Sequence, residues 1–342
     1  MRPRRPVAAL VMLGLLTFGA ASAAAGSATR AELVMGTIAR VTLADPRSDV
    51  FEAAFAALRR VDATMSLYRP ESALVRVNLH AARHAEPVDA ELFECLARAR
   101  ALSALTDGAF DATVLPLLRR WGAYRELAHL PPGRVDAVGW GGLLLDAPTR
   151  TVRFARDGMA VDLGGIAKGY GLDRARAALL AMGARRGVID LGGNLALLGE
   201  GPEGGWRIAV RDPEDPEGSV GTLVLDRDLA VSTSGNYARD FAAEGWRAPS
   251  HVYDPRTGRP VGGDLAVTVW APDATTADAL STALLVVGPP GAAAVLARLS
   301  GVGALFVEDG RITFAGVPPR GFDPRPAASP PAVRPAIMES RQ

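Results

Sequence analysis

The segment VDLGGIAKGYGLDRA, residues 161–175, places Asp162 and Lys168 on either side of a glycine pair. Glycines let the backbone approach an anion closely, and the lysine could neutralise a phosphate held there. The spacing matches neither the GxxxxGK(S/T) nor the GxGxxG pattern of known phosphate loops. On these residues alone, a phosphate-binding loop and a tight strand-to-helix turn with a solvated lysine fit the segment equally well.

A second set of oxygen-bearing side chains lies in ATTADALSTALLVVG, residues 274–288. Asp278, Ser281 and Thr282 are spaced i, i+3 and i+4, so a helix would present them on one face. One carboxylate with two hydroxyls suits a hard cation such as Mg²⁺, which takes its other ligands from water and substrate phosphates. The alternative is structural, because serine and threonine in helices often bond back to the preceding turn.

The histidines give weaker signals. His251 precedes a DPRTG turn and could act as a general base or donate to a phosphate, although Pro255 and Gly258 explain the turn by themselves. His80 and His84 are spaced i, i+4, which would suit zinc on a helix, but their polar segment offers no third ligand. We expect that pair to lie on the surface.

Two aromatic side chains could stack on a flat ring. Tyr68 lies in MSLYRPESALVRVN, residues 65–78, and Phe110 lies in GAFDATVLPLLRRWG, residues 108–122. Aromatic rings pair in offset or edge-to-face arrangements, and the same rings also fill hydrophobic cores. Judged singly, each fits a core better than a binding site.

Helical and strand periods alternate along the chain and must position these groups. Helices are predicted over residues 48–66, 89–105, 169–183 and 274–288. Ser48 or Asp49 is the expected N-cap of the first helix, and Asp89 that of the second. Strands are predicted over 37–45, 151–155, 159–162, 187–191, 195–199, 206–212, 221–226 and 265–271, with a hairpin over 304–316 that turns at Asp309 and Gly310. Several strands follow one another without helices between them, which favours an α+β fold.

Residues 1–23 have the pattern of a secretory signal peptide: arginines, a short apolar run, then small residues before a cleavage site near Ala23. Removing them leaves 35 basic against 37 acidic side chains, which predicts no basic surface for nucleic acid. The one cysteine, Cys95, excludes a disulfide within the chain and should pack as a small hydrophobe. We expect an exported protein, periplasmic or associated with the outer side of the inner membrane, that is soluble after cleavage.

The rest of the chain divides into two parts by composition. Residues 30–317 carry the periodic segments and should form the folded body. Residues 318–342 are rich in proline and lack a period, which predicts a disordered tail.

Taken together and in this order, these stretches resemble the ApbE family of FAD:protein FMN transferases over roughly residues 33–315. The matching motifs are MGT, MSLY, FDATV, DLGGIAKGYGLD, DLGGN, STSGNY, HVYDPRTG and ADALSTA. The resemblance implies an α+β, T-fold-like architecture with mixed or antiparallel sheets and packed helices. It also implies an exported enzyme that uses Mg²⁺ to split FAD, transfers FMN to a threonine or serine hydroxyl of an envelope flavoprotein, and releases AMP.

The resemblance also implies roles for individual residues. The residues expected to contact FAD are Met35, Tyr68, Ala109, Phe110, Asp111, Asp162, Lys168 and Tyr253. The metal ligands would be the backbone carbonyl of Gly165 and the side chains of Asp278, Ser281 and Thr282. His251 is the candidate acid or base near the acceptor hydroxyl. The chain departs from the family pattern at Asn236, where an aspartate is common, in WGAY in place of WGF, and in the glycine at position 165.

Two other functions fit the same motifs. An FAD pyrophosphatase giving FMN and AMP would need the same metal and phosphate contacts. A periplasmic flavin-binding protein without turnover would keep the pocket but would not need the intact Asp278, Ser281 and Thr282 face. The acceptor implied by the resemblance is an exposed threonine or serine in an Asp-containing context, often in a membrane-bound electron-transfer complex.

Overall fold

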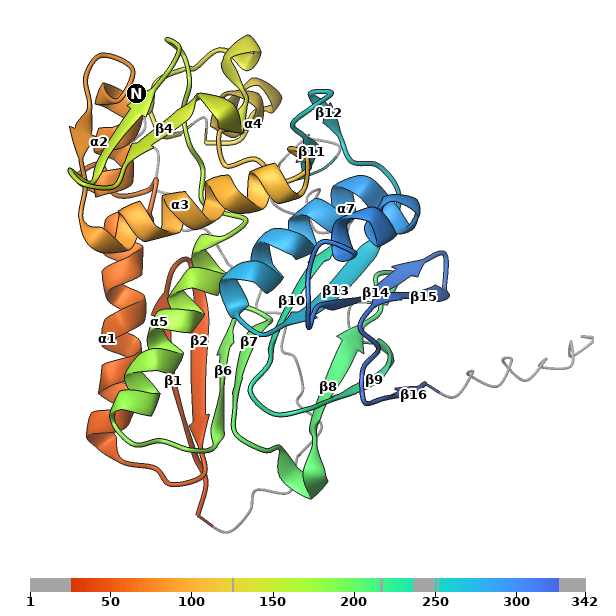
Figure 1. The fold of residues 1–342 in the computed structure, drawn as a ribbon. Helices are drawn as coiled ribbons and strands as arrows, with labels where there is room; N and C mark the ends of the chain where they lie inside the picture. The colour runs from red at the N-terminus through yellow and green to blue at the C-terminus, as the bar shows by residue number, and fades with distance from the viewer. Residues whose placement is uncertain (1–25, 125, 216–217, 236–249, 251, 326–342) are drawn as a thin grey trace, which may run out of the picture.

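The computed structural model describes residues 26–124, 126–215, 218–235, 250 and 252–325 (Figure 1). The predicted signal peptide, residues 1–23, lies outside the described residues. An eight-stranded antiparallel sheet forms the centre, and its strand order follows the order of the chain. Its strands are β1 (Ala28–Val34), β2 (Thr37–Leu43), β6 (Gly187–Leu191), β7 (Asn194–Leu198), β10 (Ala230–Gly235), β13 (Ala266–Ala271), β14 (Gly303–Glu308) and β15 (Arg311–Gly316). The predicted α+β class is confirmed.

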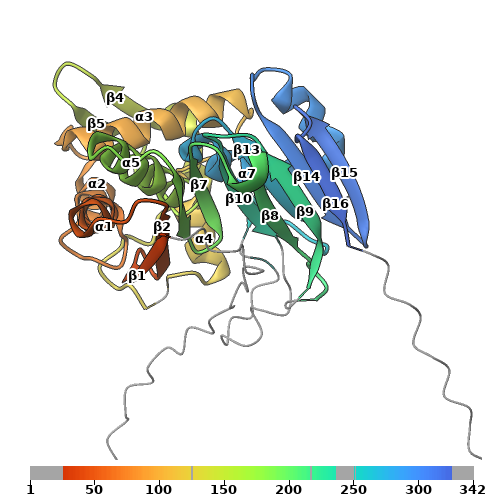
Figure 2. The same ribbon diagram turned by 90° about the horizontal axis from the view of Figure 1, so that it is seen from below.

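One face of this sheet is covered by the helices α1 (Ser48–Met65), α5 (Ala167–Ala181) and α7 (Ala274–Leu296), as Figure 2 shows from below. The helix α7 is broken at Gly288, whose φ of 64° is left-handed and which is followed by Pro289 and Pro290. Within the described residues, α7 is the one helix long and apolar enough to cross a membrane, and half of its apolar window is buried in the protein. It packs against β10 and β13 as a core helix.

A three-stranded sheet covers part of the opposite face, in the order β16 (Gly321–Pro324), β9 (Ser219–Leu225) and β8 (Trp206–Arg211). This corrects the predicted start of a disordered tail at residue 318. Phe322 packs edge-on against Phe314, with ring centroids 5.5 Å apart, and β16 pairs along β9. Because only four residues of a proline-rich segment form this strand, the composition concealed it.

A second layer of structure lies at one end of the large sheet and has its own hydrophobic core. It contains α2 (Ala73–His80), α3 (Ala90–Leu105), α4 (Leu115–Trp121) and a small sheet of β3 (Glu86–Pro87), β5 (Thr151–Phe154) and β4 (Leu143–Asp146). The hairpin of β11 (Tyr253–Asp254) and β12 (Arg259–Pro260) lies beside α4 and α7 (Figure 1). Short 3-10 turns span Val135–Ala137, Trp140–Gly142 and Pro202–Gly204.

Local predictions were right where the side chains themselves fix the backbone. The Asp89 carboxylate accepts from the N–H of Leu92 at 2.8 Å and caps α3 as predicted. Asp309 and Gly310 both have positive φ at the tip of the β14–β15 hairpin. The predicted N-cap of α1 was wrong: the cap position is Arg47, and the Asp49 carboxylate pairs with the Arg47 guanidinium.

The predicted strand over residues 159–162 is wrong. Ala160 makes only an isolated bridge, to Val114. The neighbouring backbone is satisfied by a side chain, because Asn78 donates to the Val161 carbonyl at 2.9 Å and accepts from its N–H at 2.6 Å. An extended segment held by one buried amide has the same apolar pattern as a strand.

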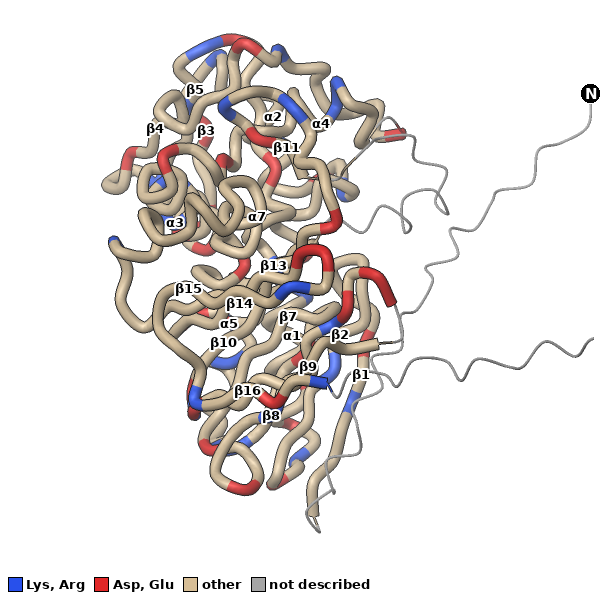
Figure 3. Tube along the Cα trace, turned by 90° about the vertical axis from the view of Figure 1, so that its right-hand side faces the viewer, with Lys and Arg blue, Asp and Glu red and all other residues tan. Residues whose placement is uncertain are grey.

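Charged residues of both signs are interspersed along the side of the molecule seen in Figure 3. Several form ion pairs at the surface, including Arg59 with Glu32 and Arg69 with Asp62. Such exposed pairs contribute about 0–1 kcal/mol each, so the stability of the fold comes mainly from its cores.

The close contact between α5 and α7 generates the first prediction. A Cβ on Gly169 would lie 2.2 Å from the Ala274 carbonyl oxygen and 2.7 Å from the Asp278 Cβ. Gly169→Ala should therefore lower the free energy of unfolding by about 1–3 kcal/mol, measured by urea denaturation. Gly262→Ala is the control, since a Cβ there meets nothing within 4 Å. A Gly169→Ala protein as stable as the control would contradict this close approach of the two helices.

Candidate functional site

The Asp278 carboxylate is the centre of the candidate site. It lies on the first turns of α7, is 4% exposed, and is held by neutral donors. Its Oδ2 accepts from the N–H of Gly169 at 2.9 Å, and its Oδ1 accepts from Asn194 Nδ2 at 2.9 Å and from Ser232 Oγ at 3.3 Å. In the described part of the chain the carboxylate forms no ion pair. A buried carboxylate without a cationic partner is costly, so this position favours a bound cation.

The other predicted metal ligands come from the loop before α5 and from the turn of α7 that follows Asp278. Gly165 and Thr282 face each other, because a Cβ on Gly165 would lie 3.1 Å from Thr282 Oγ1. The Ser281 hydroxyl is fully buried and is engaged by the Asp278 carbonyl at 2.8 Å and the Ser234 hydroxyl at 2.7 Å. Ser281 thus points into the protein interior, while half-buried Thr282 faces the loop of Gly165. The described residues contain no cluster of three or more His, Cys, Asp or Glu side chains that could hold a metal.

Asp162 lies one loop away and is also buried, at 7% exposure. Its Oδ2 accepts from the Tyr124 hydroxyl at 2.8 Å, and its Oδ1 accepts from the Gly164 N–H. Burial raises the pKa of the Asp162 carboxyl, and these two hydrogen bonds partly offset that rise. Burial and the neighbouring Asp162 raise the pKa of Tyr124 in turn, so its hydroxyl remains a donor.

The predicted aromatic contacts divide into an exposed ring and a buried one. Tyr68 is 63% exposed and meets Tyr124 edge-on, with centroids 5.8 Å apart. Phe110 is 4% exposed, and its ring lies within 3.4 Å of where a Gly165 Cβ would be. Met35 has a positive φ of 52°, and its sulfur lies close to Gly171 of α5. Phe110 and Met35 therefore lie beside the amino-terminal end of α5, whereas Tyr68 contacts Tyr124, the partner of Asp162.

The Asp111 carboxylate holds the neighbouring loops in place. It accepts from the Thr113 hydroxyl at 2.7 Å and from the Trp140 N–H at 2.9 Å. Burial raises the pKa of Asp111, and these donors oppose the rise. Because the side chain of Asp111 is already bonded within the protein, a bound ligand could contact only its backbone or a remaining lone pair of the carboxylate. Ala109, two residues earlier, is also buried.

Tyr253 enters from the β11–β12 hairpin. Its ring stacks on Trp121 of α4, with centroids 5.7 Å apart, and Trp121 Nε1 donates to the Gly258 carbonyl at 3.1 Å. The Tyr253 hydroxyl is buried and meets no hydrogen-bond partner among the described residues. An unsatisfied buried hydroxyl is the kind of group that a bound ligand completes. His251, two residues earlier, lies outside the described residues.

Lys168 is the only lysine in a chain that has 38 lysines and arginines in total. It is the second residue of α5 and is half-buried. Within the described part of the chain it has no hydrogen-bond or ion-pair partner. A free ammonium group at a helix amino terminus adds to the positive helix dipole, and both would attract an anionic ligand.

Sequence reasoning missed the residues that hold Asp278 and Asp162. Asn194 and Ser232 orient the first carboxylate, and Tyr124 binds the second. The signals were present, since Asn194 ends the DLGGN motif and Ser232 begins STSGNY. Nothing in those motifs indicated which distant carboxylate each residue would meet.

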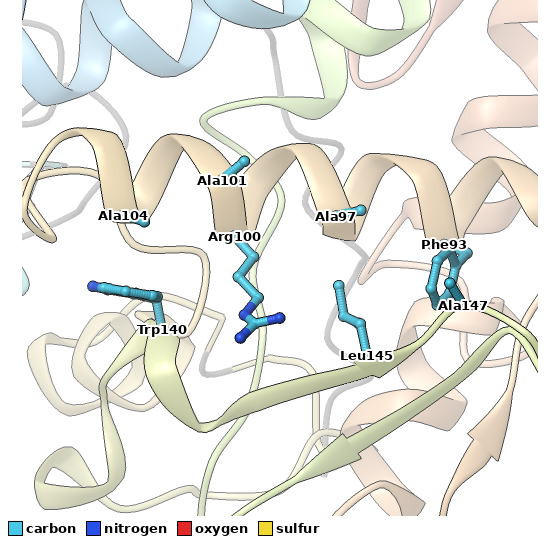
Figure 4. A pocket seen from close by; sticks show the side chains of 8 residues that line it. All are labelled: Phe93, Ala97, Arg100, Ala101, Ala104, Trp140, Leu145 and Ala147. Atoms are coloured by element: carbon cyan, nitrogen blue, oxygen red, sulfur yellow. The ribbon is translucent and has the colours of Figure 1, made fainter. Parts of the chain in front are cut away.

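A concavity of about 360 Å³ lies between α3 and the β4 loop (Figure 4) and borders on Trp140, whose N–H donates to Asp111. Arg100 points across it, and apolar side chains including Trp140 and Leu145 line it. His80 and His84 are elsewhere, with their rings stacked 5.7 Å apart, and exposed His84 bonds to Glu86 at 3.1 Å.

Comparison with known proteins identifies the family. The family model described as the ApbE family matches residues 35–306, and the chain therefore belongs to the ApbE family. A curated relative from Treponema pallidum (strain Nichols), named FAD:protein FMN transferase, is 33% identical over 307 residues, which are 82% of this chain and 84% of the relative. The resemblance found in the sequence motifs is confirmed.

Solved structures agree with this assignment. The ApbE protein of Thermotoga maritima has a TM-score of 0.73 and 31% sequence identity, and the match covers 84% of this chain and 97% of that one. The flavin transferase ApbE of Vibrio cholerae has a TM-score of 0.69 and 28% identity, with coverage of 84% and 96%. The fold over 84% of this chain is therefore that of the solved ApbE structures.

The raised pKa of Asp162 leads to a prediction about stability and pH. The folded protein binds this proton more tightly than the unfolded chain, where the pKa is near 3.8. The free energy of unfolding should therefore fall as pH rises from that value through the folded-state pKa, and the penalty is complete above it. Asp162→Asn should be more stable than wild type at neutral pH and should lose this advantage below about pH 3.8.

Urea denaturation of both proteins from about pH 3 to 8 measures this difference. Asp309→Asn, on the exposed hairpin tip, controls for loss of a surface carboxylate. An Asp162→Asn protein that is less stable than wild type at neutral pH would show that the ionised carboxylate stabilises the loop.

Proposed function

We propose that this protein transfers the FMN part of FAD to a hydroxyl group of another protein. The single observation that carries the proposal is the buried Asp278 carboxylate beside the amino terminus of α5, where neither it nor Lys168 has an ion-pair partner among the described residues. The unpaired carboxylate of Asp278 could bind a metal cation, and the unpaired ammonium group of Lys168 could bind a phosphate. Family membership and the relatives' name, FAD:protein FMN transferase, support the same reaction.

Magnesium fits the oxygen donors of this site. Asp278, Thr282 and the Gly165 carbonyl would hold it, and Ser281 would support Asp278 from the interior, which modifies the ligand set expected from the sequence. When bound, the metal would neutralise charge on the FAD pyrophosphate. Lys168 would contact the same anionic group, and the aromatic rings of Tyr68 and Tyr253 would contact the flavin dinucleotide.

The transfer is a substitution at the FMN phosphorus. A threonine or serine hydroxyl oxygen of the acceptor forms the new P–O bond, the bond to the AMP oxygen breaks, and AMP leaves with the electron pair. The hydroxyl proton would pass to a nearby base, for which His251 is our candidate. We also propose that the reaction takes place after export, on an envelope flavoprotein of an electron-transfer complex, because residues 1–23 have the pattern of a signal peptide.

Mass spectrometry tests the proposed reaction directly. Purified protein is given FAD, Mg²⁺ and synthetic peptides that carry threonine or serine beside aspartate. A peptide mass gain of one FMN residue with AMP release, abolished by EDTA, is the expected result. FMN and AMP with every peptide unmodified would favour a pyrophosphatase, and bound FAD without products would favour a flavin-binding protein.

Removing the central carboxylate should stop the reaction. Asp278→Ala deletes the only carboxylate of the proposed metal site, so we expect transfer to fall by more than about a hundredfold. The rate of AMP release measures this, with Asp309→Asn as the surface control. Near wild-type, Mg²⁺-dependent transfer by Asp278→Ala would remove Asp278 from the metal site.

Lys168 should act on FAD binding. Lys168→Met keeps the length of the side chain and removes its charge, so we expect about a tenfold or greater rise in the dissociation constant for FAD, followed by flavin fluorescence. Arg100→Met is the matched control, because Arg100 is also half-buried and unpaired in the described structure but lines the concavity between α3 and the β4 loop. Equal FAD affinities of the two variants would argue against the role of Lys168.

A further inference from the structure

We propose that Asn194 is a positioning residue that fixes the Asp278 carboxylate for metal binding. This inference rests on the proposed function, because it concerns the same metal site. Asn194 is 2% exposed and does not reach solvent. Its Nδ2 donates to Asp278 Oδ1 at 2.9 Å, so its effect on a metal must pass through the carboxylate.

The amide of Asn194 can take only one orientation. Ser232 Oγ donates to Asn194 Oδ1 at 2.9 Å, and the carboxylate can only accept from the other end of the amide. A flipped amide would place its oxygen against the carboxylate oxygen. The Asp278 carboxylate therefore fixes the orientation of the Asn194 amide, Ser232 satisfies the amide oxygen, and Asn194 in turn restrains the rotation of Asp278.

The two DLGG segments converge on this carboxylate. In the second, the Asp190 Oδ1 accepts from the Gly193 N–H at 2.8 Å and shapes the turn that delivers Asn194 to Oδ1. In the first, the chain passes Gly165 and reaches Gly169, whose N–H binds Oδ2 at 2.9 Å. Each oxygen of Asp278 is thus held by a residue that follows one of the two copies of the same short sequence.

The chemistry of an amide suits this task better than that of a charged group. A lysine or arginine at position 194 would neutralise Asp278 and compete with a metal ion. Asn194 offers one directed hydrogen bond and leaves the negative charge and the remaining lone pairs of the carboxylate free. Orienting a metal ligand in this way commonly changes metal affinity by about ten- to a hundredfold.

Two variants test the inference. Asn194→Ala removes the donor, and Ser232→Ala removes the hydroxyl that lies 2.9 Å from the amide oxygen and 3.3 Å from Asp278 Oδ1. Thr233→Ala is the matched control, since its hydroxyl is on the next residue of β10 and bonds to Thr268 at 2.9 Å, away from Asp278. For each protein we would measure the Mg²⁺ concentration giving half-maximal AMP release, the rise in Tm on adding Mg²⁺ to the FAD complex, and FAD affinity in EDTA.

We expect Asn194→Ala to raise the half-saturating Mg²⁺ concentration by about ten- to a hundredfold and to reduce the Mg²⁺-induced rise in Tm. Ser232→Ala should shift both in the same direction by less, while FAD affinity in EDTA stays within about twofold of wild type for all variants. Should Asn194→Ala fail to fold, Asn194→Leu, which keeps the side-chain volume and lacks the donor, decides the question.

Unchanged Mg²⁺ dependence in the variants would overturn the inference, as would an equal loss of FAD affinity in EDTA, which would indicate general damage to the pocket. The wild-type protein separates this result from failure of the proposed function. If wild type itself shows no Mg²⁺ dependence in turnover or Tm, the metal site is wrong and Asn194 has no ligand to position.

Discussion

The structure depends on the burial of one negative charge, that of Asp278. Neutral hydrogen-bond donors surround it, and within the described residues no cation pairs with it. Because a buried carboxylate must be hydrogen-bonded, the donors have to arrive from fixed directions. The amino terminus of α5, the first residue of β7 and strand β10 each supply one. A group that would weaken an ordinary core therefore links α7 to α5 and to two strands of the large sheet.

Other carboxylates around the site are also buried and held by hydrogen bonds. Burial raises the pKa values of Asp111, Asp162 and Asp190, and in each case the opposing contribution comes largely from N–H or O–H donors. Asp190 is also near Arg40, at 3.6 Å. Burying these carboxylates lowers the free energy of unfolding, and the hydrophobic cores must offset that loss. Such a loss is usual where a protein preorganises a binding site.

Sequence reasoning predicted the elements that are determined locally. The Asp89 cap, the Asp309-Gly310 turn and the helical period of α1 depend on neighbouring residues, and these predictions were confirmed. It failed where a distant partner decides the outcome. Asn78 holds an extended segment that has the pattern of a strand, and β9 pairs with a strand hidden in a proline-rich segment. The motifs located the candidate site. The roles of Asn194, Ser232 and Tyr124 became visible only in the structure, because a spacing in sequence does not show which carboxylate a side chain contacts.

The strand order of the large sheet has a consequence for how the chain folds. Since the strands lie side by side in the order in which they occur in the chain, each new strand joins an open edge and none has to enter between two strands already paired. The segment between β2 and β6, which carries α1 to α5, forms helices and a small sheet, and its helix α5 packs on α1 within the segment and on α7 beyond it. A polypeptide made from its amino terminus can therefore extend the sheet one strand at a time during synthesis, without opening any pair that has already formed.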